Sequence, residues 1–279
     1  MKPDYPLTLL CEVLEVSRSG YHAWTSGQRD RRTQRDQQLV PKIIEAFDAS
    51  RQTYGYPRMT IELRKGGEPV GKARVARLMR SAGLQGRQRG AFHPCTTQSN
   101  HAGPIAPNRL AKIEAITAIN QVWQADITYV ETDEGWLYLA IVLDAFSRRI
   151  LGWAFSPTLE TEFVVTALLM AVQHRGRCPK EIVFHSDRGV QYASAQFRAH
   201  LDTHGFLPSM SRRGNCYDNA KAEAFFSTLK TEFIYRRHFA THRAAHAAIF
   251  EWIEAFYNLR RRHSAIGNLS PIDFENQNN

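Results

Sequence analysis

Three acidic residues stand where carboxylates could do chemistry. Asp126 lies inside the alternating segment WQADIT, Asp187 directly follows the apolar run IVFHS, and Glu223 projects from a later segment with helical periodicity. Three carboxylates brought within a few ångströms repel one another strongly unless a cation neutralises them. Hard oxygen ligands suit Mg²⁺ or Mn²⁺ better than zinc. Taken together, the three residues predict a divalent-metal site.

Each acid alone has a simpler structural interpretation. An aspartate in a strand is often hydrogen-bonded or close to a turn, and Asp187 in the sequence HSDRG could form a turn or cap a helix. Glu223 near a helix start could merely complement the helix dipole. Their joint placement, rather than any one of them, favours a site.

The elements that must position these acids follow from the patterning after about residue 112. Three strands are expected, followed by a helix, a strand, a helix and a short strand, over 122–130, 136–146, 148–156, 162–174, 181–186, 194–204 and 206–209. The helix that carries Glu223 follows the turn-forming residues that open the stretch 214–230, and a last helix spans about 242–258. This order predicts an α/β domain with a mixed five-stranded sheet and helices on both faces. If the first and fourth strands are neighbours, Asp126 and Asp187 point into one crevice at the strand ends, and Glu223 closes it from the side.

The helix that carries Glu223 has two distinct faces. Its apolar stripe, which should pack on the sheet, comprises Ala222, Phe225, Phe226, Leu229 and Phe233. Along the edge of this stripe, Asn219, Glu223 and Lys230 fall in one polar line. Glu223 is therefore expected to face the crevice.

The first part of the chain is helical and basic. Residues 1–110 hold 18 Lys and Arg against 9 Asp and Glu, whereas the remainder is balanced at 18 against 18. The whole excess charge is thus N-terminal and suggests a polyanionic partner. Helix-turn-helix patterning ends in a helix over about 72–81, with Val75, Leu78 and Met79 inward. The outward residues, expected to meet DNA, are Lys72, Arg74, Arg77 and Arg80.

Composition and breaker residues set the domain organisation. With 279 residues, 43% of them hydrophobic, the chain can build a real core. We expect a helical DNA-binding region over 1–84, a linker over 85–111, a catalytic core over 112–274 and a tail over 275–279. There is no run of eighteen apolar residues and no signal-peptide pattern, which predicts a soluble cytoplasmic protein without membrane contact. The four cysteines are far apart and are expected to be reduced thiols.

Several sequence blocks resemble those of the IS3-family insertion-sequence transposases, in the protein made from their second reading frame. The blocks are WQADITYV, YLAIVLDAFSRRILGWAFS, FHSDRGVQYAS, SMSRRGNCYDNAKAEAFFSTLKTE and YNLRRRHSAIGNLSP, with YGYPRM, VARLMRSAGL and SRSGYHAW in the N-terminal part. Between Asp187 and Glu223 lie 35 residues, as in the D,D(35)E pattern that this family shares with retroviral integrases.

The resemblance implies a ribonuclease H-like catalytic domain with Asp126, Asp187 and Glu223 as its catalytic and metal-binding triad. It further implies two Mg²⁺ or Mn²⁺ ions, cleavage at the ends of the element, and strand transfer by a freed DNA 3′-hydroxyl. Lys230 and Asn219 are expected to contact DNA near the site. The implied partners are terminal inverted repeats, target DNA, further copies of the chain on paired ends, and the upstream-frame protein as fusion or partner. The implied location is the bacterial cytoplasm, at the nucleoid.

Two other functions remain open at this point. A structure-specific nuclease or an RNase H would share metals and fold but would cut without joining. A DNA-binding regulator could carry an inert domain of the same fold, although the intact triad argues against it.

Overall fold

The computed structural model describes residues 5–87, 103–176, 180–212 and 216–278 of the chain. Two compact units result, residues 1–87 and 88–279. The predicted linker over 85–111 lies mostly outside the described residues, so its conformation stays a prediction. We describe each unit by itself.

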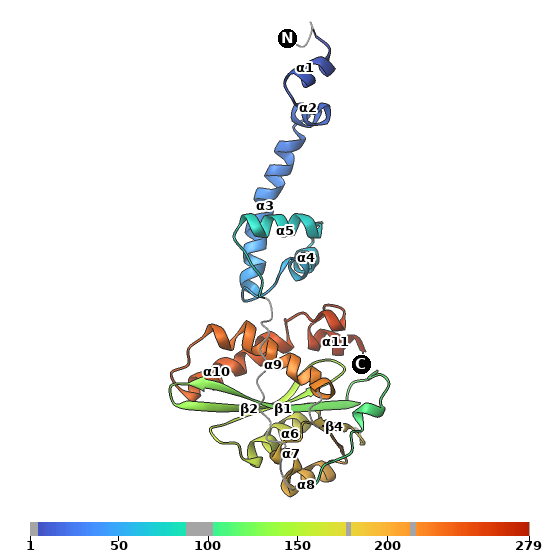
Figure 1. Cartoon of the computed structure of the whole chain (residues 1–279), viewed down its shortest axis with the longest axis vertical. Coiled ribbons are helices and arrows are strands. Elements are labelled where there is room, and N and C mark those ends of the chain that lie inside the picture. Colours follow the sequence, from blue (N-terminus) through green and yellow to red (C-terminus); the bar gives the residue numbers. More distant parts are fainter. Residues whose placement is uncertain (1–4, 88–102, 177–179, 213–215, 279) are drawn as a thin grey trace. The chain divides into compact units, whose positions relative to one another are not determined.

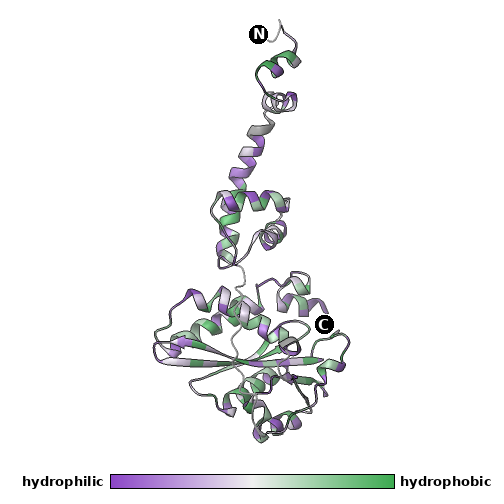
Figure 2. Ribbon diagram, viewed as in Figure 1, coloured by the Kyte–Doolittle hydropathy of each residue, from purple (hydrophilic) through white to green (hydrophobic). Residues whose placement is uncertain are grey.

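The N-terminal unit is all-helical. Its helices are α1 (Leu7–Val13), α2 (Arg18–Thr25), α3 (Gln28–Ala49), α4 (Tyr56–Lys65) and α5 (Lys72–Ser81). The helix expected over 72–81 is therefore confirmed, with Val75, Leu78 and Met79 buried. The basic run at 29–36 lies in the first half of α3, where Arg and Gln favour the helix. Figure 2 shows the coloured part of this half of α3 as largely hydrophilic.

The second unit is built on a five-stranded sheet of order β3-β2-β1-β4-β5. The strands are β1 (Val122–Thr132), β2 (Gly135–Asp144), β3 (Ile150–Ser156), β4 (Val183–Ser186) and β5 (Leu207–Met210). β1, β2 and β3 form an antiparallel meander, whereas β4 runs parallel to both β1 and β5. The first and fourth strands are indeed neighbours, and the mixed sheet is confirmed.

Helices cover both faces of this sheet (Figure 1). One face carries α6 (Thr161–Arg175), α7 (Val190–Ala193) and α8 (Ala195–Thr203), and the other carries α9 (Ala220–Glu232) and α10 (His242–Glu251). Each layer has its own apolar core, because alternate strand residues point to opposite faces. Trp123 and Ala125 lie in the core beneath α6, whereas Val130 lies in the core beneath α9.

Helix α6 lies unusually close to β3. A Cβ added at Gly152 would stand 2.0 Å from the carbonyl oxygen of Ala167 and 2.7 Å from the amide nitrogen of Ala171. Both are backbone atoms, which cannot turn aside as a side chain can. Glycine at 152 is therefore what lets α6 seat on the sheet.

The C-terminal segment belongs to the fold of the second unit. The helix expected over 242–258 is α10 continued by a π-helical stretch, Trp252–Asn258, and a final helix, α11 (Pro271–Asn278), was not expected. The tail predicted to begin at 275 instead starts inside α11. Glu275 is buried and pairs with Arg175 at 2.5 Å and Arg149 at 2.8 Å, which fixes α11 to α6 and to the β2–β3 turn. Across the described residues, every helix is too short or too polar to cross a membrane.

Candidate active site

Asp126 lies where β1 separates from β4. The β1–β4 ladder covers only residues 122–124 of β1, so Asp126 comes two residues after the last pair. On its other side it pairs with Ile141 of β2. Its partly buried carboxylate accepts a hydrogen bond from the amide of Ile127 at 2.9 Å. Strand alternation directs it to the α9 face of the sheet, opposite Ala125.

Asp187 follows the last residue of β4, at the C-terminal end expected for a ligand site. Its Oδ1 accepts the amide N–H of Gly189 at 2.9 Å, which shapes the turn into α7. A Cβ added at Gly189 would stand 3.0 Å from this oxygen, so the glycine keeps the turn tight. The neighbouring Arg188 donates from Nε to the carbonyl of Ser211 at 2.7 Å and ties the turn to the segment after β5.

Glu223 lies in the first turn of α9 and is exposed. The apolar stripe beside it is confirmed, since its five predicted members all lie in the core beneath α9; they are Ala222, Phe225, Phe226, Leu229 and Phe233. Hydrophobic burial of this stripe sets the rotation of α9 on the sheet. Glu223 therefore sits at the edge of the stripe, as the sequence predicted.

The three acids act on one another electrostatically. Burial raises the pKa of Asp126 well above its usual range, and the charges of Asp187 and Glu223 raise it further, whereas Lys230 lowers it. Within the described part of the chain, no three His, Cys, Asp or Glu side chains lie close enough to share a metal ion. The effects of Asp187 and Glu223 on Asp126 place the three carboxylates in one region, and Glu223 is the most exposed of the three.

Lys230 and Asn219 are less accessible than the sequence suggested. Lys230 is only 7% exposed, and its ammonium lies 4.5 Å from the centre of the Tyr129 ring. Asn219 is also buried, and its amide donates to the carbonyl of Ala125 at 3.3 Å. Their predicted contacts with DNA remain predictions, because both side chains face β1 in this structure rather than open solvent.

A polar network that the sequence did not reveal holds the segment leading into α9. The buried Gln124 donates to the backbone carbonyl of Asp218 at 3.1 Å. The carboxylate of Asp218 accepts from the amide N–H of Arg212 at 3.0 Å and from the side chain of Asn108 at 2.9 Å. His185, fully buried, contacts the hydroxyls of Ser209 and Ser211 at 2.9 and 3.0 Å. These two contacts hold the His185 ring between the serines.

Tyr192 of α7 is a further residue that the sequence did not single out. It is 2% exposed, and its hydroxyl has no hydrogen-bond partner among the described residues. Burial raises the pKa of Tyr192, and the charges of Asp187 and Asp126 raise it further. A buried phenol O–H therefore lies near the two aspartates. Only its position after Asp187 in the sequence HSDRGVQY could have indicated this.

The basic residues of α5 divide into two pairs. Arg74 and Arg77 bridge the carboxylate of Asp36 on α3 at 2.7 and 2.5 Å, which ties α5 to α3. Lys72 and Arg80 are exposed, and no ion pair of theirs is found among the described side chains. The structure thus leaves Lys72 and Arg80 as the more available candidates for DNA contact.

Known protein families match both units of the chain. The integrase core domain family matches residues 117–216, a second integrase core domain family matches residues 204–271, and an HTH-like domain matches residues 34–92. The chain is 42% identical over 278 residues to the transposase InsF for insertion sequence IS3A of Escherichia coli, covering 99% of this chain and 96% of that protein. It belongs to the IS3 family of insertion-sequence transposases. The transposase is also 44% identical over 265 residues to a 31 kDa protein of insertion element IS600 from Shigella sonnei, covering 95% of this chain and 97% of that protein.

Solved structures of integrases and transposases are similar to this transposase. The catalytic core of HTLV-2 integrase, in complex with magnesium, is 14% identical with a TM-score of 0.43, covering 56% of this chain and 95% of that one. The catalytic domain of the Mos1 mariner transposase is 11% identical with a TM-score of 0.42, covering 49% of this chain and 71% of that one.

Family membership establishes the general activity. The transposase has a ribonuclease H-like integrase core preceded by a helix-turn-helix-like domain, and it acts in DNA transposition as a DDE polynucleotidyl transferase. Enzymes of this core family depend on divalent metal ions. The family does not by itself state which side chains of this chain do the chemistry.

Proposed function

We propose that Asp126, Asp187 and Glu223 are the catalytic triad with which this transposase cleaves DNA at the ends of its element and joins them to target DNA. The observation that carries the proposal is the electrostatic convergence of these carboxylates from three separate elements, β1, the end of β4 and the start of α9. An ordinary surface would not gather like charges around a partly buried aspartate, because each raises the cost of ionising the next.

The donor set fits Mg²⁺ or Mn²⁺. All three candidate ligands are carboxylates, which are the hard oxygen donors that these ions prefer. Asp126 and Asp187 would be shared ligands held by short backbone hydrogen bonds, and Glu223 would complete the set from α9. When bound, a pair of such ions activates the attacking oxygen and stabilises the leaving oxygen in displacement at phosphorus.

The residues of the chain prepare this chemistry in defined ways. The amide of Gly189 holds the Oδ1 oxygen of Asp187 at the turn, and Lys230 offsets part of the negative charge at Asp126. The Gln124–Asp218 contact fixes the segment from which α9 begins, and so sets where Glu223 starts. The same set of side chains serves water in cleavage and a DNA 3′-hydroxyl in joining.

Further partners belong to this proposal. Terminal inverted repeats and target DNA would be the substrates, with Lys72 and Arg80 of α5 contacting phosphates in the N-terminal unit. Several copies of the chain would assemble on paired ends, and the upstream-frame protein would act as a fusion or partner. The site of action would be the cytoplasm, on the nucleoid.

The test uses the full chain with a labelled DNA that carries the terminal inverted repeat, with and without Mg²⁺. Asp126→Asn, Asp187→Asn and Glu223→Gln should each reduce cleavage and joining by several orders of magnitude while DNA binding in EDTA stays near the wild-type level. The matched control is Asp133→Asn, an exposed acid in the turn that follows the same strand. Near-normal joining by any one triad variant would contradict the proposal.

The same assay separates the two other functions. A nuclease would give cut products without joined ones, and an inert regulator would bind the DNA without cutting it. Both outcomes would be read from one gel on the wild-type chain.

A further inference from the structure

An exposed aromatic surface lies beside the proposed site. Trp136 at the start of β2 is 49% exposed, and its ring meets that of Tyr129 edge to face with centroids 4.8 Å apart. Tyr235 lies in the single turn Ile234–Arg236 after α9 and is 59% exposed. Partial burial raises the pKa of Tyr235, and the nearby Tyr129 raises it further. We refer to Tyr129, Trp136 and Tyr235 as the aromatic shelf.

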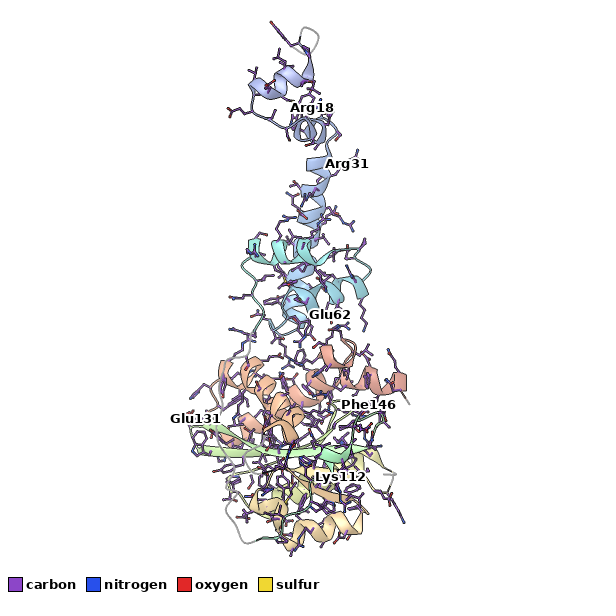
Figure 3. The ribbon with its side chains drawn as sticks, turned by 45° about the vertical axis from the view of Figure 1, so that its right-hand side comes forward. Arg18, Arg31, Glu62, Lys112, Glu131 and Phe146 are labelled. Atoms are coloured by element: carbon purple, nitrogen blue, oxygen red, sulfur yellow. The ribbon has the colours of Figure 1, made fainter. Side chains whose placement is uncertain are left out.

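Backbone contacts bring the two parts of the shelf together. The amide of Asp133, in the β1–β2 turn, donates to the carbonyl of Phe239 at 3.1 Å, and His238 contacts the Asp133 carboxylate at 2.8 Å. The amide of His242 donates to Glu134 at 2.6 Å. The segment after α9 is thereby docked on the hairpin tip, and the two acids of the tip already have partners. Figure 3 labels Glu131, the strand partner of Trp136, at this outer end of the sheet.

Lys230 connects the shelf to the acidic site. Its ammonium lies over the Tyr129 ring at 4.5 Å, and its charge also acts on Asp126. A group resting on the shelf is therefore separated from the proposed reacting centre by one buried lysine.

Two basic side chains stand next to Tyr235 in the sequence. Arg236 and Arg237 follow Tyr235 directly and are exposed. The guanidinium of Arg237 lies 4.2 Å from the centre of the Phe233 ring, and this cation–π contact restricts its position. Half-exposed aromatic faces interleaved with arginines are the combination that binds unpaired nucleotides, with bases stacked and phosphates paired.

We propose that the aromatic shelf binds unpaired nucleotides of the DNA end, with a base stacked on Trp136 and the adjoining phosphates on Arg236 and Arg237. This inference rests on the proposed function and adds to it a subsite that distinguishes a frayed or single-stranded end from blunt duplex. Inside duplex DNA each base is stacked between its neighbours, whereas an unpaired base leaves its faces open to Trp136. The exposed Glu131 beside Trp136 repels phosphate, so the base rather than the backbone occupies that position.

The test measures binding by the full chain in EDTA, where cleavage does not interfere. Two probes of equal duplex length are compared, one blunt and one with a single-stranded extension that contains a fluorescent purine analogue. Trp136→Ala should weaken binding of the extended probe by about 5-fold to 150-fold, the usual range for loss of one stacked base, and should abolish quenching of the analogue. Binding of the blunt probe should not change.

Further variants separate stacking from other effects. Trp136→Phe should keep most of the affinity and the quenching, whereas Tyr235→Ala, in an exposed single turn, should lose part of both even if Trp136→Ala folds poorly. Phe250→Ala removes an aromatic ring of similar exposure, 45%, which contacts Trp153 on β3, and should change nothing. Arg236→Gln should reduce the salt dependence of binding by about one unit of slope.

Three results would overturn the inference. The first is wild-type affinity and quenching with Trp136→Ala, and the second is equal weakening on both probes. The third is a change of oligomeric state in Trp136→Ala with DNA binding unaltered, which would mark the shelf as a contact with another copy of the chain. None of these touches the triad, whose failure would show instead as normal joining by Asp126→Asn.

Discussion

Lys230 and Asp126 lie close enough for the charge of each to affect the other across the contact between α9 and β1. Burial lowers the pKa of Lys230, and Asp126 raises it in return. Burial and the charges of Asp187 and Glu223 raise the pKa of Asp126, whereas Lys230 lowers it. The lysine is thus a built-in counter-charge for the aspartate, held in place by the Tyr129 ring.

Replacing Lys230 should shift the pH dependence of joining. Lys230→Met keeps the aliphatic stem but removes the charge, so Asp126 should ionise less readily and the pH–rate profile should move to higher pH. At neutral pH we expect a loss on the order of tenfold, the size of one charge-assisted contact of about 1.4 kcal/mol. Lys230→Arg, which keeps the charge, should lose less.

A direct phosphate contact by Lys230 predicts something different. In that case Lys230→Met would lower the salt slope of DNA binding by about one, with no shift of the pH profile. Measuring both quantities on the same variant decides between the two roles.

Asp126→Asn should stabilise the metal-free transposase. In the folded state the pKa of the Asp126 carboxyl is raised above its ordinary value of 3.8. Its contribution to the stability of the fold is therefore complete when the pH is below that ordinary value, and it is lost as the pH rises through the raised pKa. At about pH 8 in EDTA the variant should therefore melt above the wild type, and near about pH 4 the difference should vanish. Added Mg²⁺ should raise the melting temperature of the wild type far more than that of the variant. Equal melting at both pH values would contradict the convergence of the three acids.

His185 should make the second unit sensitive to acid. Burial lowers the pKa of His185 from 6.5 to about 4. A group with a lowered folded pKa contributes stability that is present above the unfolded pKa and is lost as pH falls toward the folded one. As the pH falls from the unfolded to the folded pKa, the free energy of unfolding should decrease by about 3 kcal/mol. Urea unfolding at several pH values should show this slope in the wild type and a smaller one in His185→Gln.

Gly152→Ala should destabilise the second unit. The added methyl would meet the backbone of α6 at Ala167 and Ala171, so the helix must shift, at a cost of about 1–3 kcal/mol or more. Gly71→Ala is a suitable comparison, because a Cβ at that position meets no atom within 4 Å. Chemical denaturation of both variants checks the difference. Similar stability for Gly152→Ala and the wild type would show that α6 moves without cost.

The sequence determined most of the strands and helices of the second unit, although not α11, and it singled out the three acids. Alternation placed Asp126 on a strand, the apolar stripe fixed the face of α9 beside Glu223, and the blocks around Asp187 and Glu223 identified the family. These features are local, because periodicity of 2 or 3.6 residues reports which side of its own element a residue occupies.

Only the tertiary structure decided what lies opposite each of those faces. Lys230 was expected to point toward DNA, because helical periodicity cannot show that α9 brings its ammonium over the Tyr129 ring. Arg74 and Arg77 looked like a DNA-contacting pair until α3 supplied Asp36. Glu275 looked like part of a tail until Arg175 met it from 100 residues away. Long-range packing and charge pairing depend on how separate elements meet, which no single stretch of sequence encodes.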